Sequence, residues 1–109
     1  MIYEVEVSEQ ADCDLRGIFE YIAFELQSPE NAIGQLDRLE EQILSLDAMP
    51  KRYRKYEKEP WKSRELHILP VDNYVILYIP NSDKKVVTIL RVMYAGRDID
   101  NQLNFHTKQ

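Results

Sequence analysis

The sequence predicts an α+β domain in which an antiparallel helical hairpin packs on a small, mainly antiparallel twisted sheet, with the element order β-α-α-β-β-β. Two segments with apolar residues at helical spacing fill the first half of the chain. Runs of β-branched and aromatic residues, separated by turn-forming residues, fill the second half. Segregated helices and strands are typical of a helical layer on a sheet. We expect a single domain over residues 1–109, because 44% hydrophobic content suffices for one core.

The first strand and the first helix are expected at the N-terminus. Residues 2–7 alternate as I-Y-E-V-E-V, which predicts a strand with Ile2 and either Val5 or Val7 toward the core. Ser8 suits the N-cap of the helix that follows, and the acids behind it suit the positive end of a helix. One helical face then carries the apolar residues Ala11, Leu15, Ile18, Phe19, Ile22 and Leu26.

A second helix is predicted to begin at residues 28–30, with serine as its cap and proline at its first position. Its apolar residues recur at three- and four-residue spacing as far as Leu46, and Met49-Pro50 ends it. The short connection to the first helix indicates an antiparallel hairpin. Two long helices on one small sheet are expected to leave an apolar groove or rim where a partner segment docks.

Three strands are expected to follow. Residues 63–69 alternate, which places Leu66 and Ile68 on one face of a strand and Glu65 and His67 on the other. A turn over residues 70–73 then leads into the clearest β-hairpin of the chain.

This hairpin joins Y-V-I-L-Y-I to V-V-T-I-L-R-V-M-Y through the polar turn P-N-S-D-K-K. Gly96 then lets the backbone leave the sheet sharply, which predicts that Arg97 lies at the end of the sheet. Residues 98–109 are polar, so we expect this tail to fray unless Ile99, Leu103 and Phe105 attach it to the core.

The charge distribution restricts the possible partners. A net charge of −5 excludes a protein that binds nucleic acid with its whole surface. However, residues 51–62 carry six of the fourteen basic residues, which indicates a local phosphate- or acid-facing surface. The candidate binding residues on this basic loop are Lys51, Arg52, Arg54, Lys55 and Lys58.

Other classes of protein are not supported by the sequence. No apolar run is long enough for a membrane span and the N-terminus lacks a secretion signal, so a cytosolic location is expected. A single cysteine, Cys13, excludes an internal disulfide and a multi-cysteine metal site. Its acidic neighbours oppose thiolate formation, so we interpret it as an ordinary helix residue. No metal or cofactor is predicted.

Several motifs occur together in a characteristic order. They are D-L-R-G-I-F-E-Y-I in the first helix, S-P-E-N-A at the start of the second, P-x-R-Y after it, R-E-L and V-D-N-Y-V-I-L-Y-I in the strands, and the closing V-T-I-L-R-V-M-Y-A-G-R-D. In this order they resemble the RelE/ParE family of toxins from bacterial toxin–antitoxin modules. The resemblance extends from Ile2 to about Leu103.

The resemblance implies one of two activities. RelE-type members cleave messenger RNA on the ribosome without a metal, which requires a base, cations for the phosphorane and an acid for the leaving oxygen. ParE-type members poison DNA gyrase by binding and need no catalytic residues. Either branch implies a cognate antitoxin partner, and operator DNA bound only indirectly, through the antitoxin.

The chain departs from the nuclease pattern at two positions. Val75 stands where RelE-like sequences carry an arginine after the first tyrosine of G-Y-R-L-V-Y, and Leu103 stands where they carry a terminal tyrosine. Arg97 matches the strand-end arginine of both branches. If the chain is a nuclease, the expected catalytic residues are Arg97, Arg64, His67 and Tyr94, with Arg64 and His67 reaching across the sheet toward Arg97.

Two of these residues, and Trp61 of the basic loop, also have a structural interpretation. His67 is an ordinary strand histidine in that case, Arg97 forms an ion pair with Asp98, and Trp61 anchors the basic loop on the core. The missing catalytic groups slightly favour a toxin that binds an essential target such as gyrase. The alternatives are a ribosome-dependent mRNA endonuclease and a non-toxic family member that retains only antitoxin binding.

Overall fold

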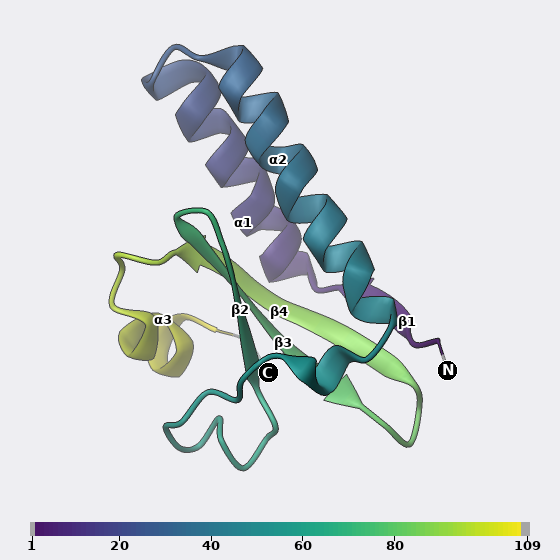
Figure 1. The fold of residues 1–109 in the computed structure, drawn as a ribbon. Helices are drawn as coiled ribbons and strands as arrows, with labels where there is room; N and C mark the ends of the chain where they lie inside the picture. The colour runs from purple at the N-terminus through teal and green to yellow at the C-terminus, as the bar shows by residue number, and fades with distance from the viewer. Residues whose placement is uncertain (1, 108–109) are drawn as a thin grey trace.

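The computed structural model describes residues 2–107 and consists of a helical hairpin on one face of a four-stranded sheet, with a third helix on the opposite face (Figure 1). The predicted α+β architecture is confirmed. Residues 1, 108 and 109 of the expected domain and tail lie outside the described residues. The elements are β1 (Glu4–Val7), α1 (Glu9–Glu20), a π-helical turn (Tyr21–Glu25), α2 (Pro29–Leu44), β2 (His67–Val71), β3 (Tyr74–Asn81), β4 (Val86–Tyr94) and α3 (Ile99–His106).

The sheet has the strand order β1-β4-β3-β2. β4 pairs with β3 in the predicted antiparallel hairpin, in a register that sets Tyr74 opposite Tyr94. β3 pairs with β2 in the same sense, with Tyr74 opposite Val71. β1 lies parallel to β4, so that the first and last strands of the sequence are neighbours.

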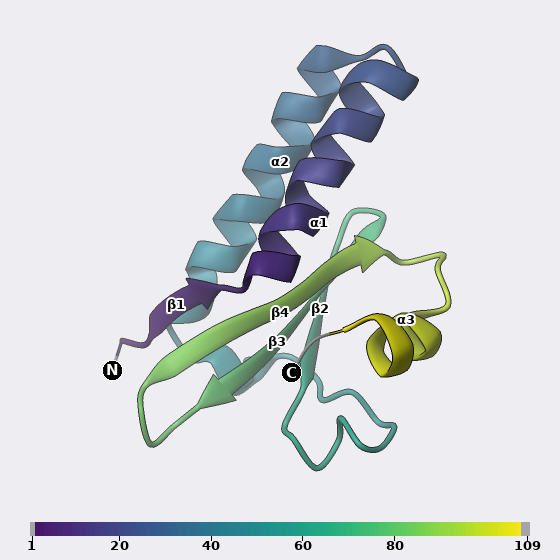
Figure 2. The same ribbon diagram turned by 180° about the vertical axis from the view of Figure 1, so that it is seen from behind.

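The two long helices form the expected antiparallel hairpin, which projects beyond the sheet (Figures 1 and 2). Ser8 caps α1, because its Oγ accepts a hydrogen bond from Ala11 N at 3.0 Å. Ser28 occupies the cap position of α2 and Pro29 its first position, as predicted, but the Ser28 side chain makes no capping bond; its carbonyl accepts from Ala32 N at 3.0 Å. The π-helical turn follows α1 directly and ends with Leu26 N donating to Tyr21 O.

Both faces of the sheet are buried. The hairpin covers a cluster on one face that includes Leu15, Leu39, Leu46, Leu69, Ile76, Tyr78 and Ile89. The cluster on the opposite face includes Trp61, Leu66, Ile68, Val75, Leu77, Met93 and Leu103. β4 is therefore covered on both sides, which explains its nearly continuous run of apolar residues.

The described part of the C-terminal tail forms α3 and is attached to the core, which is the alternative to fraying that Ile99 and Leu103 suggested. Asp98 caps α3 through a hydrogen bond from Asn101 N to Asp98 Oδ1, and Leu103 is completely buried against the sheet. Ile99 packs beside it, as expected, whereas Phe105 remains exposed. Two apolar residues one helical turn apart, Ile99 and Leu103, are enough to hold α3 in place, because the sheet face opposite the helical hairpin is apolar.

The strand predicted over residues 63–69 begins later, at His67, and continues through Pro70. Residues 63–65 form a turn, and Glu65 has a positive φ of 63°. Pro70 fits in β2 because β2 is an edge strand, where a missing N–H removes no ladder bond. Leu66 and Ile68 share one face and His67 lies on the other, as predicted, and His67 is buried there.

Candidate functional site

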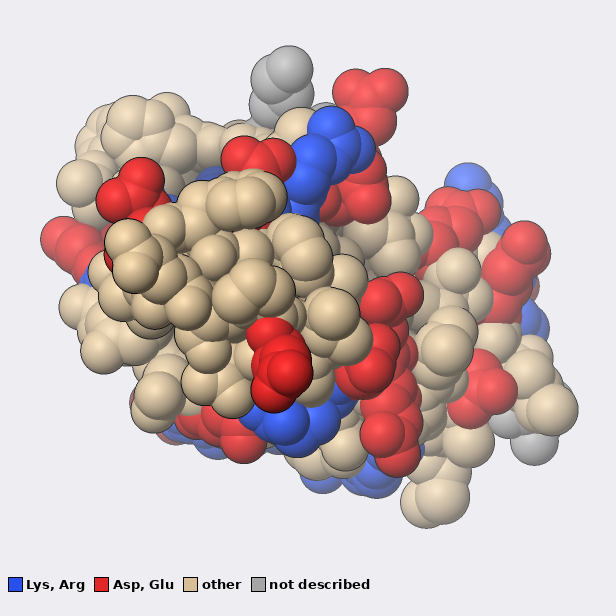
Figure 3. Space-filling view, turned by 90° about the horizontal axis from the view of Figure 1, so that it is seen from above, with Lys and Arg blue, Asp and Glu red and all other residues tan. Residues whose placement is uncertain are grey.

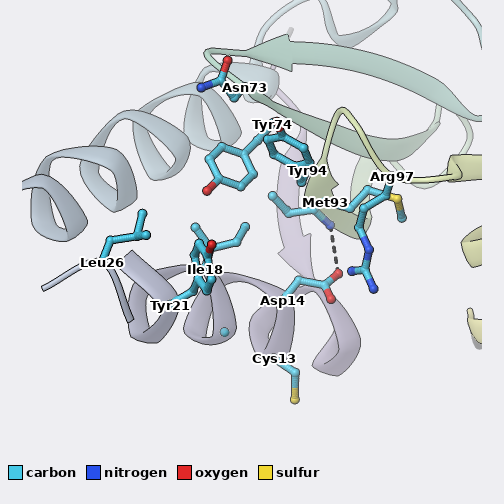
Figure 4. Close-up of a pocket in the computed structure, with 12 residues that line it drawn as sticks. Cys13, Asp14, Ile18, Tyr21, Leu26, Asn73, Tyr74, Met93, Tyr94 and Arg97 are labelled. Carbon is cyan, nitrogen blue, oxygen red and sulfur yellow. Dashed lines mark hydrogen bonds between the residues drawn. The ribbon is translucent and has the colours of Figure 1, made fainter. Parts of the chain in front are cut away.

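A hollow lies between the projecting helical hairpin and the end of the sheet (Figure 4). We call it the hairpin groove; it has a volume of about 750 Å³. Its walls come from α1, from the turn after α1, from the start of β3 and from the end of β4. The lining residues used below are Asp14, Ile18, Tyr21, Leu26, Tyr74, Met93, Tyr94 and Arg97.

Aromatic side chains form much of the groove. Tyr74 and Tyr94 pack edge to face, with ring centroids 6.0 Å apart. Partial burial raises the pKa of Tyr74. Gly96 makes room for this arrangement, since a Cβ there would lie only 2.4 Å from the Tyr94 ring. Tyr94 is half exposed and is available to a partner.

The apolar surface continues from the groove onto the tip of the hairpin. Tyr21, Phe24, Leu26 and Ile33 are all more than half exposed. Seen from above, the tip shows a mainly uncharged surface bordered by acidic and basic side chains (Figure 3). Exposed apolar residues that adjoin a groove are typical of a protein-binding surface.

One wall of the groove is held by a buried ion pair. Arg91 Nε donates to Asp14 Oδ2 at 2.6 Å and Arg91 Nη2 donates to Asp14 Oδ1 at 3.0 Å. Val92 N also donates to Asp14 Oδ2, the bond drawn in Figure 4. Arg91 Nη1 reaches Thr107 Oγ1 at 3.0 Å, at the end of α3. Asp14 is therefore fully engaged by β4 and is not available to a ligand.

Arg97 lies at the end of the sheet, as predicted, and is exposed. Within residues 2–107 its side chain makes no ion pair. The interpretation that Arg97 pairs with Asp98 is therefore not supported, because Asp98 caps α3 instead. Arg97 is the cation of the groove and is free to meet an anionic group.

Arg97 also lines a second, smaller hollow of about 380 Å³ beside α3. Arg54, Tyr56 and Lys58 from the basic loop line it too, so the structure brings part of this loop next to Arg97. Lys58 Nζ and the Tyr56 hydroxyl both contact Asp100. The pKa of the Asp100 carboxyl is lowered first by Lys58 and then by Tyr56.

Several side chains of the basic loop contact other parts of the protein. Arg52 donates to the Met49 carbonyl at 3.2 Å, near the end of the second helix, and its guanidinium lies over the Tyr53 ring. Lys55 forms an ion pair with Glu65 at 2.6 Å and lowers the pKa of that carboxyl.

Among the five predicted binding residues, Arg52, Lys55 and Lys58 therefore have internal partners. Lys51 and Arg54 make no ion pair within residues 2–107. Trp61 anchors the loop as predicted, because it is buried and its Nε1 donates to Asn104 Oδ1 at 2.9 Å.

The expectation that Arg64 and His67 reach toward Arg97 is wrong. Arg64 lies over the Trp61 ring, 5.1 Å from its centroid, and lines a hollow near the turn between β3 and β4. His67 is 1% exposed, its Nδ1 is 2.9 Å from the Glu65 carbonyl, and its ring packs against Tyr78.

The reason lies in the register of the sheet. β2 starts at His67, which pairs with Tyr78 at one end of the β2–β3 ladder, whereas Tyr94 pairs with Tyr74 at the other. Among the four predicted catalytic residues, only Tyr94 and Arg97 line a common hollow.

The two positions that depart from the nuclease pattern belong to the core. Val75 and Leu103 are both buried in the cluster between the sheet and α3.

No three His, Cys, Asp or Glu side chains within residues 2–107 are grouped so as to hold a metal ion. In the same part of the chain, no helix is long and apolar enough to cross a membrane.

Sequence reasoning did not identify Asp14 and Arg91 as a pair. The signal was present, since an arginine in the middle of V-T-I-L-R-V-M requires a buried anionic partner. Asp14 could not be singled out as that partner among the many acids of the first two helices.

Comparison with solved structures identifies proteins of the same fold. The chromosomal ParDE toxin–antitoxin system from P. aeruginosa superposes with a TM-score of 0.71 at 18% identity, over 85% of this chain and 96% of that one. The toxin–antitoxin complex RelBE2 from Mycobacterium tuberculosis gives 0.64 at 21% identity, over 86% and 92%. A mutant of E. coli toxin RelE in the free state gives 0.64 at 16% identity, over 91% and 90%.

A search of curated protein sequences found no match. The family model for the ParE toxin of the type II toxin–antitoxin system parDE matches residues 5–99, which is most of the chain. With the helical hairpin, the β1-β4-β3-β2 sheet and the arginine at its end in place, this match shows that the chain belongs to the ParE toxin family of type II toxin–antitoxin systems.

Proposed function

We propose that this toxin inhibits growth by binding an essential protein target, with DNA gyrase as the family precedent, and that it does not cleave RNA. The observation that carries the proposal is that the groups needed for RNA cleavage do not meet at Arg97. His67 is buried, and Arg64 lies near the opposite end of the sheet. Valine and leucine fill the two positions where RelE-like sequences carry catalytic groups.

The surface offered to the target is suited to protein binding. The hairpin groove combines half-exposed aromatic side chains with one unpaired cation, Arg97. Interfaces of this kind gain affinity from buried aromatic residues and orientation from a charged contact. A bound protein segment would place apolar side chains between Tyr21 and Tyr94 and an acidic group beside Arg97.

We further propose that a cognate antitoxin binds this chain and thereby prevents contact with the target. Two of the structural neighbours described above are a ParDE toxin–antitoxin system and a RelBE2 complex, which supports a partner of this kind. Operator DNA would then be bound indirectly, through the antitoxin. Size-exclusion chromatography of the co-expressed pair should give a single complex, and two separate peaks would contradict this proposal.

One observation favours RNA cleavage as a second candidate. Arg54 and Arg97 line a common hollow together with Tyr56, whose ring could stack on a base. Two cations near an aromatic ring suit a phosphate and its nucleotide. Against this candidate, Lys58 and Tyr56 in the same hollow are already bound to Asp100, which also brings negative charge to the site.

The experiment that separates the candidates is pulse labelling after induction in a bacterial host without antitoxin. Methionine and thymidine incorporation are followed in the same culture during the first minutes. An early fall in DNA synthesis is expected for the proposed function. An early fall in protein synthesis would refute it in favour of RNA cleavage, and normal growth would identify a non-toxic family member.

A further inference from the structure

The chain leaves the sheet through a tight turn over residues 94–97. Arg97 N donates to the Tyr94 carbonyl at 3.1 Å, which closes a four-residue turn with Gly96 at its third position. Ala95 N donates to the carbonyl of Asn73 at 2.8 Å, so the turn is also tied to the residue before β3. Two backbone hydrogen bonds therefore hold the segment that carries Tyr94 and Arg97 into the hairpin groove.

The backbone conformation does not explain why residue 96 is glycine. Gly96 does not adopt a positive φ, so residues with a side chain could take the same conformation. The restriction comes from the Tyr94 ring instead. A Cβ on Gly96 would lie 2.4 Å from Tyr94 Cε2, 3.0 Å from Cδ2 and 3.3 Å from Cζ. The ring thus occupies the space in which any other residue would place its Cβ.

The Tyr94 ring has a second contact within the groove. Tyr74 meets it edge to face, with centroids 6.0 Å apart and ring planes at 75° to each other. In Figure 4 both rings lie across the groove from Ile18 and Tyr21 of the hairpin. Contacts with Gly96 and Tyr74 together set the direction of the Tyr94 side chain, although half of its surface is exposed.

A methyl group at position 96 would move this ring and preserve the fold. Carbon atoms in van der Waals contact lie about 3.5–4.0 Å apart, so the edge of the ring would have to retreat by about 1 Å or more. The colliding atoms belong to the far end of a half-exposed side chain, which can rotate toward solvent. The hydrogen bonds of the turn use backbone atoms alone and do not depend on the ring.

We propose that Gly96 is a positioning residue of the hairpin groove, which holds the Tyr94 ring in the direction in which it meets the protein target beside Arg97. This role rests on the proposed function, in which the target binds in the groove. Interfaces depend strongly on a few aromatic residues, and a ring that is already oriented loses less conformational freedom on binding. Glycine is needed at position 96 because of the ring at position 94, so the need disappears when the ring is removed.

The first test locates the ring by nuclear magnetic resonance of the isotope-labelled protein without a partner. We expect nuclear Overhauser contacts to the Tyr94 ring from the Gly96 α-protons and from the Tyr74 ring. Gly96→Ala should weaken or abolish the contact between the two rings. The matched control is Gly34→Ala, where the nearest atom to the added methyl group is Arg38 Nη1 at 3.4 Å, and it should leave the ring contact unchanged. An unmoved Tyr94 ring in Gly96→Ala would overturn the proposal.

The second test measures the amount of toxin that halves the growth rate of a host without antitoxin, with toxin levels determined by immunoblot in the same cultures. Gly96→Ala should raise this amount by about five-fold or more, and Tyr94→Ala by at least as much. In the Tyr94→Ala background, Gly96→Ala should add less than about two-fold, because the ring that it displaces is already absent. In the Tyr94→Phe background it should keep its full effect, since the ring remains.

Two results of this cycle would overturn the proposal. One is full toxicity of Gly96→Ala, and the other is an equal loss from Gly96→Ala with and without the Tyr94 ring, because glycine would then act through the backbone. If Gly96→Ala fails to fold, the variant Gly96→Ala/Tyr94→Ala decides: its folding would identify the ring as the cause of the glycine requirement, and its failure would refute that cause.

The identity of the target is tested separately, in the parent chain. Pulse labelling of the parent shows whether DNA synthesis is inhibited first, and a different target would refute the proposed function while the comparison of variants still decides the role of Gly96. A parent chain that does not inhibit growth would overturn both.

Discussion

Replacing Asp14 with alanine should lower the free energy of unfolding by about 3–5 kcal/mol, because it leaves the Arg91 guanidinium buried without its counter-charge. The side chains of Arg91 and Asp14 are only 5% and 15% exposed, so water cannot replace the lost carboxylate. Three hydrogen bonds to Asp14 are lost as well, two from Arg91 and one from Val92 N. The better helix propensity of alanine returns at most about 0.7 kcal/mol, which cannot offset this loss.

The matched control lies two residues earlier on the same helix. Asp12 pairs with Arg16 at 2.8 Å, but both side chains are at least 60% exposed, so Asp12→Ala should cost no more than about 0.5 kcal/mol. Urea unfolding followed by far-ultraviolet circular dichroism measures both variants. The combined variant Asp14→Ala/Arg91→Met should be more stable than the sum of the single effects predicts, since it removes the stranded charge together with its partner. A loss below about 1 kcal/mol for Asp14→Ala would refute the argument that this pair is a buried, mutually dependent unit.

Three further predictions concern α3 and the end of the sheet. Leu103→Ala should cost about 2–5 kcal/mol in urea unfolding because Leu103 is completely buried, whereas the exposed Phe105→Ala should be nearly neutral. The pKa of Asp100 is lowered by Lys58, so its contribution is present above the unfolded pKa of about 3.9 and is lost as the pH falls through the lower folded value. Asp100→Asn should therefore be less stable than the parent protein at neutral pH, and the difference should shrink below about pH 4; a difference independent of pH would contradict this. Arg97→Ala should abolish growth inhibition on induction and leave co-purification with the antitoxin intact, and a fully toxic variant would remove Arg97 from the site.

The elements that could be predicted from the sequence are those with strong local signals. Ser8 followed by acids fixed the start of the first helix, and two β-branched runs around a polar turn identified β3 and β4. In these segments the local preference of the chain agrees with the packing of the finished fold. The position of Arg97 followed from the same hairpin, because the strand ends just before it.

The errors fall where tertiary contacts outweigh local pattern. The alternation of residues 63–69 resembled a strand, but burial of Trp61 and Leu66 holds the first part of this segment in a turn. The polar composition of residues 99–106 gave no clear helix signal, because the stability of α3 depends on the burial of Leu103 against the sheet. His67 was expected to reach toward Arg97, yet its neighbours in space are the Tyr78 ring and the Glu65 carbonyl.

The parallel pairing of β1 with β4 has a consequence for synthesis of the toxin. The Ser8 hydroxyl that caps the first helix donates to the carbonyl of Leu90, 82 residues later in the chain. Contacts of such separation form late, because the intervening chain must first be made and its loop closed. A ribosome that translates this message therefore releases β4 only after β1, the two long helices, β2 and β3 have been made. The four-stranded sheet cannot be completed before that point, and a chain truncated before β4 lacks the strand on which β1, β3 and the Asp14–Arg91 pair all depend.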